Sequence, residues 1–225
     1  FGFIERAKLE RLRSGPVVWV HAVSVGESKA VIPLLKLLKI KHPEVKILFS
    51  TVTATGNRSI EREAGTMIDA LIYFPLDLSW VIGRVLDATR PALFVVVEKE
   101  LWPNLLKALR ARGVPSVVVN GTISDRSFRR FMKFGFFFRE IFASIDLFCA
   151  RTSDDMRKAV EAGVDPSKVR AFGNLKFDLD PEAPPPERIA VLRYNLGIGP
   201  ADKVIVAGST HAGEEAQVIR TFKVL

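Results

Sequence analysis

The stretch Pro16-Val-Val-Trp-Val-His-Ala-Val-Ser-Val-Gly-Glu27 decides the fold class, because an apolar run passes within it directly into a helical pattern. The run predicts a strand over 17–23, and the pattern that follows predicts a helix over 28–40. In an open α/β sheet, ligands bind at the carboxyl ends of the strands, where such joins occur. Ser24, Gly26 and Glu27 are therefore expected in a ligand crevice.

Two interpretations of Glu27 are open at this point. The positive end of the helix dipole favours an ionised carboxylate in the first turn, and a carboxylate aimed into a crevice can take a proton from a substrate hydroxyl. However, a stabilised anion is also a weaker base. Ser24-x-x-Glu27 also matches a capping box, in which the carboxylate turns back onto the backbone. Taken alone, these residues favour the capping box.

The rest of the first 178 residues alternates strand-like runs with helical patterns. Strands are predicted over 46–51, 70–74, 92–97, 116–120, 147–150 and 169–172, and helices near 56–65, 78–89, 103–112, 125–142 and 153–162. Alternation with nearly continuous apolar strands predicts a Rossmann-like α/β fold, a parallel sheet with helices on both faces. No G-x-G-x-x-G follows the first strand, which argues against dinucleotide binding.

The pattern restarts after a proline-rich segment. We expect a domain over 1–178, a stiff linker over 179–187 and the beginning of a second α/β domain over 188–225. The second domain is predicted to have a helix near 187–196, a strand over 203–207 and another helix opened by Gly208–Glu215. The chain starts at Phe1 and stops within a helical pattern, so both ends are expected to be cut, with an upstream membrane anchor absent from this chain.

Composition limits the classes of partner. The net charge of +8 favours an anionic partner such as a phosphorylated substrate, an anionic lipid or a nucleic acid. The single cysteine, Cys149, cannot form an internal disulfide, which indicates a reducing compartment. The three histidines lack the spacing of a zinc site, and no metal is expected.

Other polar residues follow predicted strands. Glu98 ends the run over 92–97, and a solvated loop carboxylate is the simpler interpretation of it. Thr53, Thr55 and Gly56 follow the second strand, where hydroxyls and helix amides suit a phosphate or a sugar. Ordinary capping by Thr55 is the favoured alternative. Asn120 ends the fifth strand in the same manner.

Residues 126–139 interleave five basic residues with six phenylalanines. Three interpretations are open: an element docking on anionic lipid, a nucleic-acid surface, or a core helix with a basic solvent face. The chain has no aromatic-rich strand motif of an RNA-binding sheet, so nucleic acid ranks below lipid.

Six motifs together resemble a known family. In order they are His21–Glu27, Thr51–Gly56, Glu98–Asn104, Asn120–Arg130, Gly173–Asp178 and Gly208–Glu215. The chain resembles the bacterial 3-deoxy-D-manno-octulosonic acid (Kdo) transferases from about Pro16 onward. The resemblance implies the N-terminal half of a GT-B glycosyltransferase plus the start of its second domain. The enzyme would move Kdo from CMP-Kdo to a lipid A precursor in lipopolysaccharide synthesis, with inversion and without a metal ion or other cofactor.

The resemblance also implies roles for individual residues. Glu27 corresponds to the general base, and Glu98 to a second acid on the acceptor side. The remaining acceptor-binding residues would be Ser24, Gly26, Thr53, Thr55, Gly56, Asn120, Arg126, Arg129 and Arg130. The donor-binding residues would be Ser209, Thr210, His211 and Glu214. The basic surface would hold a bisphosphorylated lipid at the cytoplasmic face of the inner membrane, and no nucleic-acid partner is expected.

The chain departs from the family pattern in places. Lys99 replaces a more frequent threonine, and Gly121-Thr122 replaces an alanine–arginine pair. The lost arginine puts phosphate contacts there in doubt, although Arg126 could substitute. The short chain is not expected to complete transfer alone. Another lipid-directed GT-B glycosyltransferase and a non-catalytic basic module that binds membranes or nucleic acid remain alternatives.

Overall fold

The computed structural model describes residues 2–98, 100–179 and 183–224. The chain divides into two compact units, residues 1–180 and 181–225. Lys99 and part of the expected linker, residues 180–182, lie outside the described residues.

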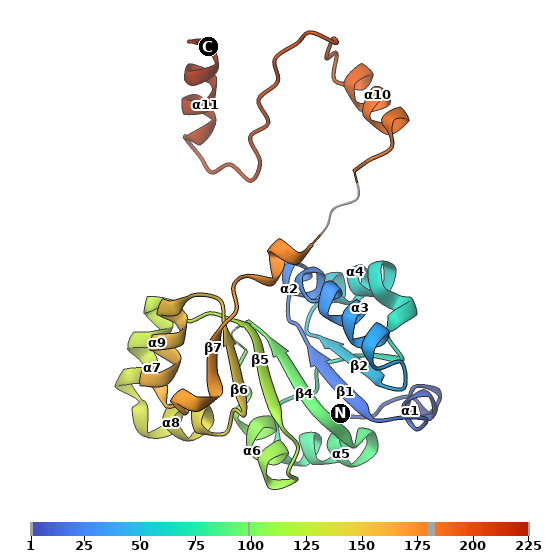
Figure 1. Ribbon diagram of the computed structural model, residues 1–225, viewed down its shortest axis with the longest axis vertical. Helices are drawn as coiled ribbons and strands as arrows, with labels where there is room; N and C mark the ends of the chain where they lie inside the picture. The colour runs from blue at the N-terminus through green and yellow to red at the C-terminus, as the bar shows by residue number, and fades with distance from the viewer. Residues whose placement is uncertain (1, 99, 180–182, 225) are drawn as a thin grey trace. The chain divides into compact units, whose positions relative to one another are not determined.

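In the described part of the first unit, one parallel sheet has the strand order β3-β2-β1-β4-β5-β6-β7 (Figure 1). The strands are β1 (Val17–His21), β2 (Lys46–Thr51), β3 (Ala70–Tyr73), β4 (Pro91–Val97), β5 (Ser116–Gly121), β6 (Leu147–Ala150) and β7 (Val169–Ala171). The helices are α1 (Arg6–Leu12), α2 (Val25–Ala30), α3 (Ile32–Lys41), α4 (Ala54–Ala64), α5 (Ser79–Thr89), α6 (Pro103–Ala111), α7 (Asp125–Lys133), α8 (Gly135–Ala143) and α9 (Ser153–Ala162). Short 3-10 turns are η1 (Gly65–Met67), η2 (Pro166–Lys168) and η3 (Leu175–Asp178). The predicted Rossmann-like sheet is confirmed.

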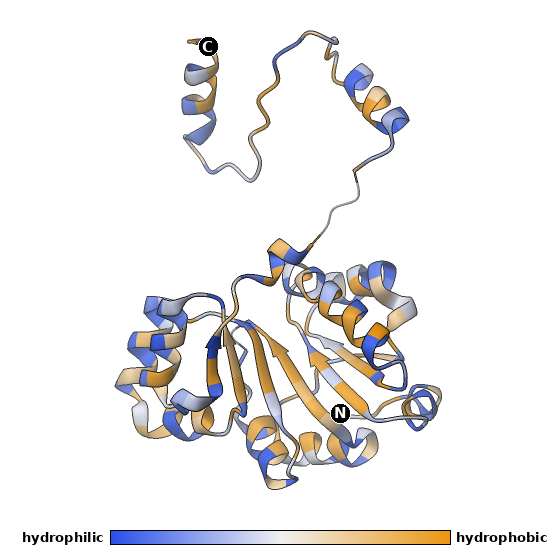
Figure 2. Ribbon diagram, in the orientation of Figure 1, coloured by the Kyte–Doolittle hydropathy of each residue, from blue (hydrophilic) through white to orange (hydrophobic). Residues whose placement is uncertain are grey.

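Both faces of the sheet are covered because the strands are apolar on both sides. Trp19 and Phe94 belong to a core cluster that includes side chains of α1 and α5–α9. Val18 and Val20 belong to a second cluster on the other face, with side chains of α3 and α4. Figure 2 shows the central strands β1, β2, β4 and β5 as mostly hydrophobic. Burying a phenylalanine such as Phe94 contributes about 1.5–3 kcal/mol.

The strand order reverses between β1 and β4, which makes this the topological switch point of the sheet. A crevice forms there at the carboxyl ends of the strands, because the connections leave in opposite directions. The loops after β1 and β4 border this position, and the loop after β5 lies next to it (Figure 1).

Two predicted helices are each divided in the structure. The helix expected over 28–40 is α2 and α3, with a break at Val31. Pro33 lies in the first turn of α3, where its missing amide hydrogen costs nothing, whereas inside a longer helix its ring would clash with the preceding turn. The helix expected over 125–142 is α7 and α8, divided at Phe134 just before Gly135. α1 was not predicted.

The second unit contains α10 (Pro186–Asn195) and α11 (Glu214–Phe222). The prediction of a strand over 203–207 is wrong, because these residues form no regular element. A strand needs a neighbouring backbone to receive its hydrogen bonds, and the described residues of this unit offer none. None of residues 183–224 is buried. Among the described residues of the whole chain, no helix has the length and apolarity needed to cross a membrane.

Candidate functional site

Glu27 lies in the first turn of α2 and forms the capping box that the sequence allowed. Its Oε2 accepts hydrogen bonds from the amides of Val23 at 2.6 Å and Ser24 at 3.2 Å, and Ser24 Oγ accepts from the Glu27 amide at 3.3 Å. The side chain is buried, with the residue 6% exposed. The expectation that this carboxylate lies open to the crevice is therefore wrong for this structure. The unpaired amides at the helix start draw it back onto the backbone.

Ser24 and Gly26 themselves are exposed at this edge of the sheet. A Cβ at Gly26 would meet only Ser24 Oγ, at 3.9 Å, so the chain's own packing leaves space around it. The structure thus presents the backbone of this turn to solvent while it withdraws the Glu27 carboxylate.

The turn between β2 and α4 lies beside the turn after β1. Thr53, and not Thr55, is the N-cap of α4, since its Oγ1 accepts from the Gly56 amide at 3.1 Å. The Thr53 hydroxyl also lies 3.4 Å from the Val23 carbonyl oxygen. A Cβ at Gly56 would lie 2.9 Å from Thr53 Oγ1, so glycine allows the cap to close. Thr53, Thr55 and Gly56 are thus brought to the same edge as Ser24.

Glu98 and Asn120 meet at the ends of β4 and β5. Asn120 Nδ2 donates to Glu98 Oε1 at 3.4 Å, and Lys176 of η3 pairs with the same oxygen at 3.4 Å. Asn120 Oδ1 accepts from the Leu175 amide at 3.1 Å. The Glu98 side chain is only 12% exposed, so it is not the solvated loop carboxylate considered above. These contacts tie the segment after β7 to the switch-point edge, where η3 also contacts α2 (Figure 1).

Both Glu98 and Asn120 adopt a left-handed backbone conformation, with φ of 66° and 55°. A residue other than glycine is uncommon there, and asparagine tolerates it better than glutamate. Such strain persists where surrounding contacts impose it, and it is frequent at functional sites. At Glu98 the observed contacts supply that constraint: its amide donates to the Val119 carbonyl oxygen at 2.9 Å, and its carboxylate has partners on two other elements.

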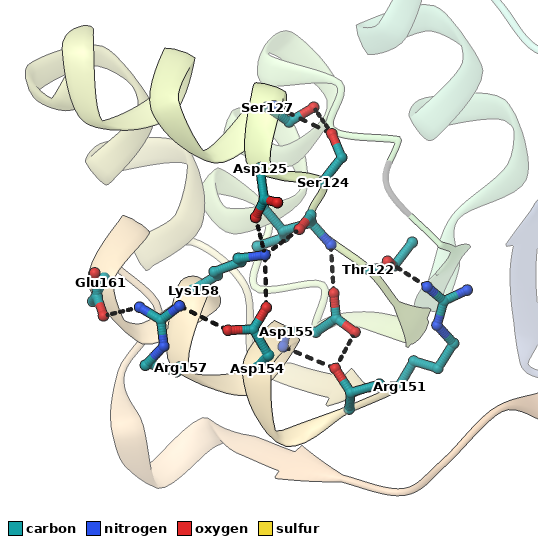
Figure 3. A network of polar contacts seen from close by, with 12 residues as sticks. Thr122, Ser124, Asp125, Ser127, Arg151, Asp154, Asp155, Arg157, Lys158 and Glu161 are labelled. Atoms are coloured by element: carbon teal, nitrogen blue, oxygen red, sulfur yellow. Dashed lines mark hydrogen bonds and ion pairs between the residues drawn. The ribbon is translucent and has the colours of Figure 1, made fainter.

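The loop after β5 is fixed by a polar network from α9, drawn in Figure 3. Asp155 Oδ1 accepts from the Ile123 amide at 2.8 Å, and Lys158 Nζ donates to the Ile123 carbonyl at 3.3 Å. Lys158, whose side chain is 8% exposed, also bridges Asp125 and Asp154 at 2.6 and 2.7 Å. Its hydrogen bonds hold the pKa of both carboxyl groups below their ordinary value. Asp155, Lys158 and their partners therefore make this loop a rigid part of the site.

The departures at Gly121 and Thr122 have physical explanations. A Cβ at position 121 would lie 2.5 Å from Cε1 of the buried Phe148 ring, so alanine does not fit beside this phenylalanine. The Thr122 hydroxyl accepts from Arg151 Nη2 at 3.0 Å (Figure 3). Arg151 thus brings a guanidinium group to the position of the lost arginine.

The basic and aromatic residues of 126–139 serve several purposes. Phe131 and Phe142 are buried, whereas Phe134, Phe136 and Phe137 are exposed. The phenylalanines thus divide between the core and the surface, and no single one of the three interpretations covers them all. Arg126, Arg129 and Arg130 are exposed on α7, and of these only Arg130 lines a cavity with Glu98.

The expected donor-side residues belong to the second unit. The His211 amide donates to Glu214 Oε2 at 2.9 Å, which makes a local turn before α11. Ser209 is in a left-handed conformation, with φ of 56°, and Thr210 donates a hydrogen bond that helps to lower the pKa of Glu215. The structure thus gathers these residues near the start of one helix.

His21, at the end of β1, is fully buried and is stacked on Phe74 with ring centroids 4.0 Å apart. Burial lowers its pKa from 6.5 to about 4, although a hydrogen bond to the Ser50 carbonyl opposes the shift. Its Nε2 and the indole nitrogen of Trp102 have no partner among the described residues. His21 is therefore a neutral core residue. No group of three His, Cys, Asp or Glu residues in the described ranges is arranged to bind a metal ion.

Sequence reasoning missed two charged residues of this edge, Lys176 and Arg151. Arg151 directly follows β6, so the rule that selected Glu98 and Asn120 would also have selected it. Lys176 lies within the motif Gly173–Asp178, but the motif assigned it no role, because it reaches Glu98 only through a turn that follows β7 by several residues.

Comparison with known proteins shows the family of the chain. The family model described as "3-Deoxy-D-manno-octulosonic-acid transferase (kdotransferase)" matches residues 1–179. The chain is 33% identical over 92% of its length to a 3-deoxy-D-manno-octulosonic acid transferase from Haemophilus influenzae and 34% identical over 92% to one from Bordetella pertussis. It covers 48% of each, and so spans about half the length of these relatives.

Solved structures share the fold at low sequence identity. One is a putative UDP-N-acetylglucosamine 2-epimerase from Listeria monocytogenes, with a TM-score of 0.55 at 14% identity, covering 81% of this chain and 52% of that one. Another is the UDP-GlcNAc 2-epimerase from Neisseria meningitidis, with a TM-score of 0.52 at 15% identity, covering 93% and 55%. They support the fold alone, whereas the family model and the sequence relatives decide the family. The chain belongs to the 3-deoxy-D-manno-octulosonic-acid transferase family, the Kdo transferases.

Proposed function

We propose that this chain is the acceptor-binding part of a glycosyltransferase that moves Kdo from CMP-Kdo to a lipid A precursor, with inversion and without a metal ion. Family membership over residues 1–179 is the observation that carries the proposal. The polar residues collected at the switch point support it, because this is the edge at which open α/β sheets bind ligands. In this proposal residues 1–178 form the acceptor domain, and 188–225 begin the donor domain.

Glu27 is the proposed general base. It would take the proton from the acceptor hydroxyl as that oxygen attacks the anomeric carbon, while CMP leaves from the opposite face of the sugar. In the present arrangement its Oε2 accepts hydrogen bonds from two backbone amides. Catalysis therefore requires the side chain to turn away from Val23 and Ser24 when the acceptor closes the crevice. The proposal accordingly gives Glu27 two states, a cap in the resting chain and a base in the complex.

The residues around Glu98 would orient the acceptor sugar. Glu98 and Asn120 present carboxylate and amide groups whose positions are already determined by Lys176 and Leu175. Ser24, Gly26, Thr53, Thr55 and Gly56 would contact the acceptor from the neighbouring turns. Arg126, Arg129 and Arg130 would attract its phosphates, because guanidinium groups pair well with phosphate oxygens.

The donor would be held by the second domain. Ser209, Thr210, His211 and Glu214 gather near the start of α11, and amides at a helix start suit a phosphate. The proposal assigns these residues to CMP-Kdo, the proposed donor substrate.

The membrane side of the proposal rests on α7 and α8. Phe134, Phe136 and Phe137 are 46%, 88% and 48% exposed, and the Lys133 ammonium lies 5.7 Å from the centre of the Phe134 ring. Aromatic side chains beside cations favour an anionic bilayer surface. We place the protein at the cytoplasmic face of the inner membrane, where a lipid A precursor would be met. Co-sedimentation with liposomes that contain anionic lipid should exceed co-sedimentation with neutral ones.

The complete gene product tests the proposal directly. It should transfer Kdo from CMP-Kdo to a lipid A precursor, which mass spectrometry detects as a product heavier by one or more Kdo units. Transfer from a UDP-sugar instead would assign the chain to another lipid-directed glycosyltransferase. No transfer from either donor, together with tight binding to single-stranded nucleic acid, would contradict the proposal and favour a non-catalytic module.

A further inference from the structure

A cavity of about 280 Å³ opens beside Glu98, between the loops after β4 and β5 and helices α7 and α8. The lining residues differ in polarity and in burial. The fully buried part is apolar and consists of Ile123, Phe131, Phe142 and Phe148, and the half-buried Leu101 and Phe138 extend it. The polar part of the lining consists of the half-buried Glu98, Glu100, Thr122 and Ser127 and the exposed Arg130, and Glu98 is paired with Lys176.

The apolar part has rigid walls. The rings of Phe131 and Phe138 lie 4.6 Å apart, and those of Phe131 and Phe142 lie 5.1 Å apart in an edge-to-face arrangement. Ile123 forms another wall, and its backbone is held at both ends by Asp155 and Lys158 (Figure 3). The cavity is therefore preformed, and it does not depend on a ligand to open it.

Protein interiors are close-packed, and apolar cavities of this kind bind apolar groups when they can reach them. The buried wall offers no donor or acceptor for a sugar or a nucleotide. A cavity of 280 Å³ has room for one alkyl chain.

We propose that this cavity binds one acyl chain of a phosphorylated lipid acceptor, with the phosphate near Arg130 and the sugar toward Glu98. The inference rests on the proposed function, because that function supplies the acylated, phosphorylated acceptor. Charge complementarity determines the orientation. Helix α7, which lines part of the cavity, carries Arg126, Arg129 and Arg130, and these cations suit an anionic headgroup. The phenylalanine side chains of the lining suit the alkyl chain.

Isothermal titration calorimetry of the 225-residue chain with alkyl phosphates of increasing length tests this proposal. The alkyl phosphates are kept below their critical micelle concentrations. Affinity should rise about three- to fourfold for each added methylene, and the rise should stop at the chain length that fills the cavity. Ser127 lines the cavity on α7, and Ser127→Phe should abolish the dependence on length while butyl phosphate still binds. The matched control is Met132→Phe, which adds the same ring to an exposed position of α7 outside the lining and should leave the dependence intact.

A second variant keeps the proposal testable if Ser127→Phe does not fold. Phe138→Ala enlarges the cavity and should move the plateau to chains about three carbons longer. The proposal is overturned if both variants fold and their affinity for alkyl phosphates depends on alkyl-chain length as in wild type. The alkyl chain would then bind the exposed phenylalanines and not the cavity.

Activity distinguishes this inference from the proposed function. In the complete gene product, Ser127→Phe should raise KM for an acylated acceptor at least tenfold and leave KM for the deacylated acceptor unchanged. If wild type and Ser127→Phe have equal KM values for the acylated acceptor and both transfer Kdo, the acyl-chain site is contradicted and the proposed function is not. If Ser127→Phe abolishes the dependence of affinity on alkyl-chain length but the wild-type gene product shows no transferase activity, the cavity site is supported and the proposed function is not.

Discussion

Several polar residues of the site use side-chain oxygens to satisfy backbone amides near the ends of strands. Glu27 accepts from Val23 and Ser24, Asn120 accepts from Leu175, and Asp155 accepts from Ile123. A buried amide without a partner costs about 1–3 kcal/mol, so these contacts fix the loops before any ligand arrives. A residue of this kind supports the site through the backbone as well as through its own chemistry.

His21 should make stability depend on pH. Its pKa is lowered to about 4, so between pH 6.5 and pH 4 the unfolded chain binds a proton that the folded chain excludes. Stability attributable to His21 is therefore present above pH 6.5 and is lost as the pH falls toward 4, by about 3 kcal/mol in total. His21→Phe keeps an aromatic ring against Phe74 and should remove this dependence.

Urea unfolding at pH 7 and pH 4.5 measures the effect. The difference in unfolding free energy between the two pH values should be clearly smaller for His21→Phe than for wild type. The exposed His42 provides the control, since His42→Phe should behave as wild type. An equal loss of stability in wild type and His21→Phe would show that His21 is protonated without strain in the folded state.

Among the structural elements, the loop after β5 connects the sheet, the candidate site and the cavity. Gly121 allows the strand to pass the Phe148 ring, Thr122 meets Arg151, and Ile123 is held by α9. The identity of each residue in this loop therefore depends on a neighbour that is distant in the sequence.

Gly121→Ala should destabilise the fold by about 1–3 kcal/mol, because its Cβ would overlap the buried Phe148 ring and force it to shift. Gly135→Ala is the control: a Cβ there meets nothing within 4 Å, so stability should be unchanged or slightly higher. Thermal unfolding compares the two. The double variant Gly121→Ala, Phe148→Leu should recover part of the loss, and simple additivity would contradict the explanation.

The comparison of predicted and observed elements shows which features the sequence pattern predicts and which it does not. Every strand of the first unit was predicted within two residues of its observed ends, because an apolar run needs only its own residues to be recognised. Helix breaks such as the one at Phe134 were missed, since apolar residues continue across them. The contact between Lys176 and Glu98 could not be predicted either, because it depends on a segment that crosses the edge of the sheet.

At the scale of the whole molecule, the two units differ in how completely they bury their apolar residues. The first has two core clusters on opposite faces of its sheet, whereas no described residue of the second is buried. Ile219 and Phe222 of α11 are 56% and 50% exposed. The sequence indicated the second unit by its restarted pattern, but a strand over 203–207 needs partners that the described residues do not include.

A chain that ends at residue 180 should therefore melt within about 2 °C of the 225-residue chain, because the cooperative unit is the sheet and its helices. Circular dichroism during heating measures both midpoints. A midpoint lower by several degrees in the shorter chain would contradict this account, since it would show that residues 181–225 stabilise the first unit.

The central claim is that Glu27 leaves its cap to act as the base. Glu27→Gln tests it in the complete gene product, because glutamine can still cap the helix but cannot take the proton. The account predicts an unchanged melting temperature and a fall of about 10²- to 10⁴-fold in kcat for transfer from CMP-Kdo. A kcat within a few-fold of wild type, at the same melting temperature, would contradict it and leave Glu27 as a cap alone.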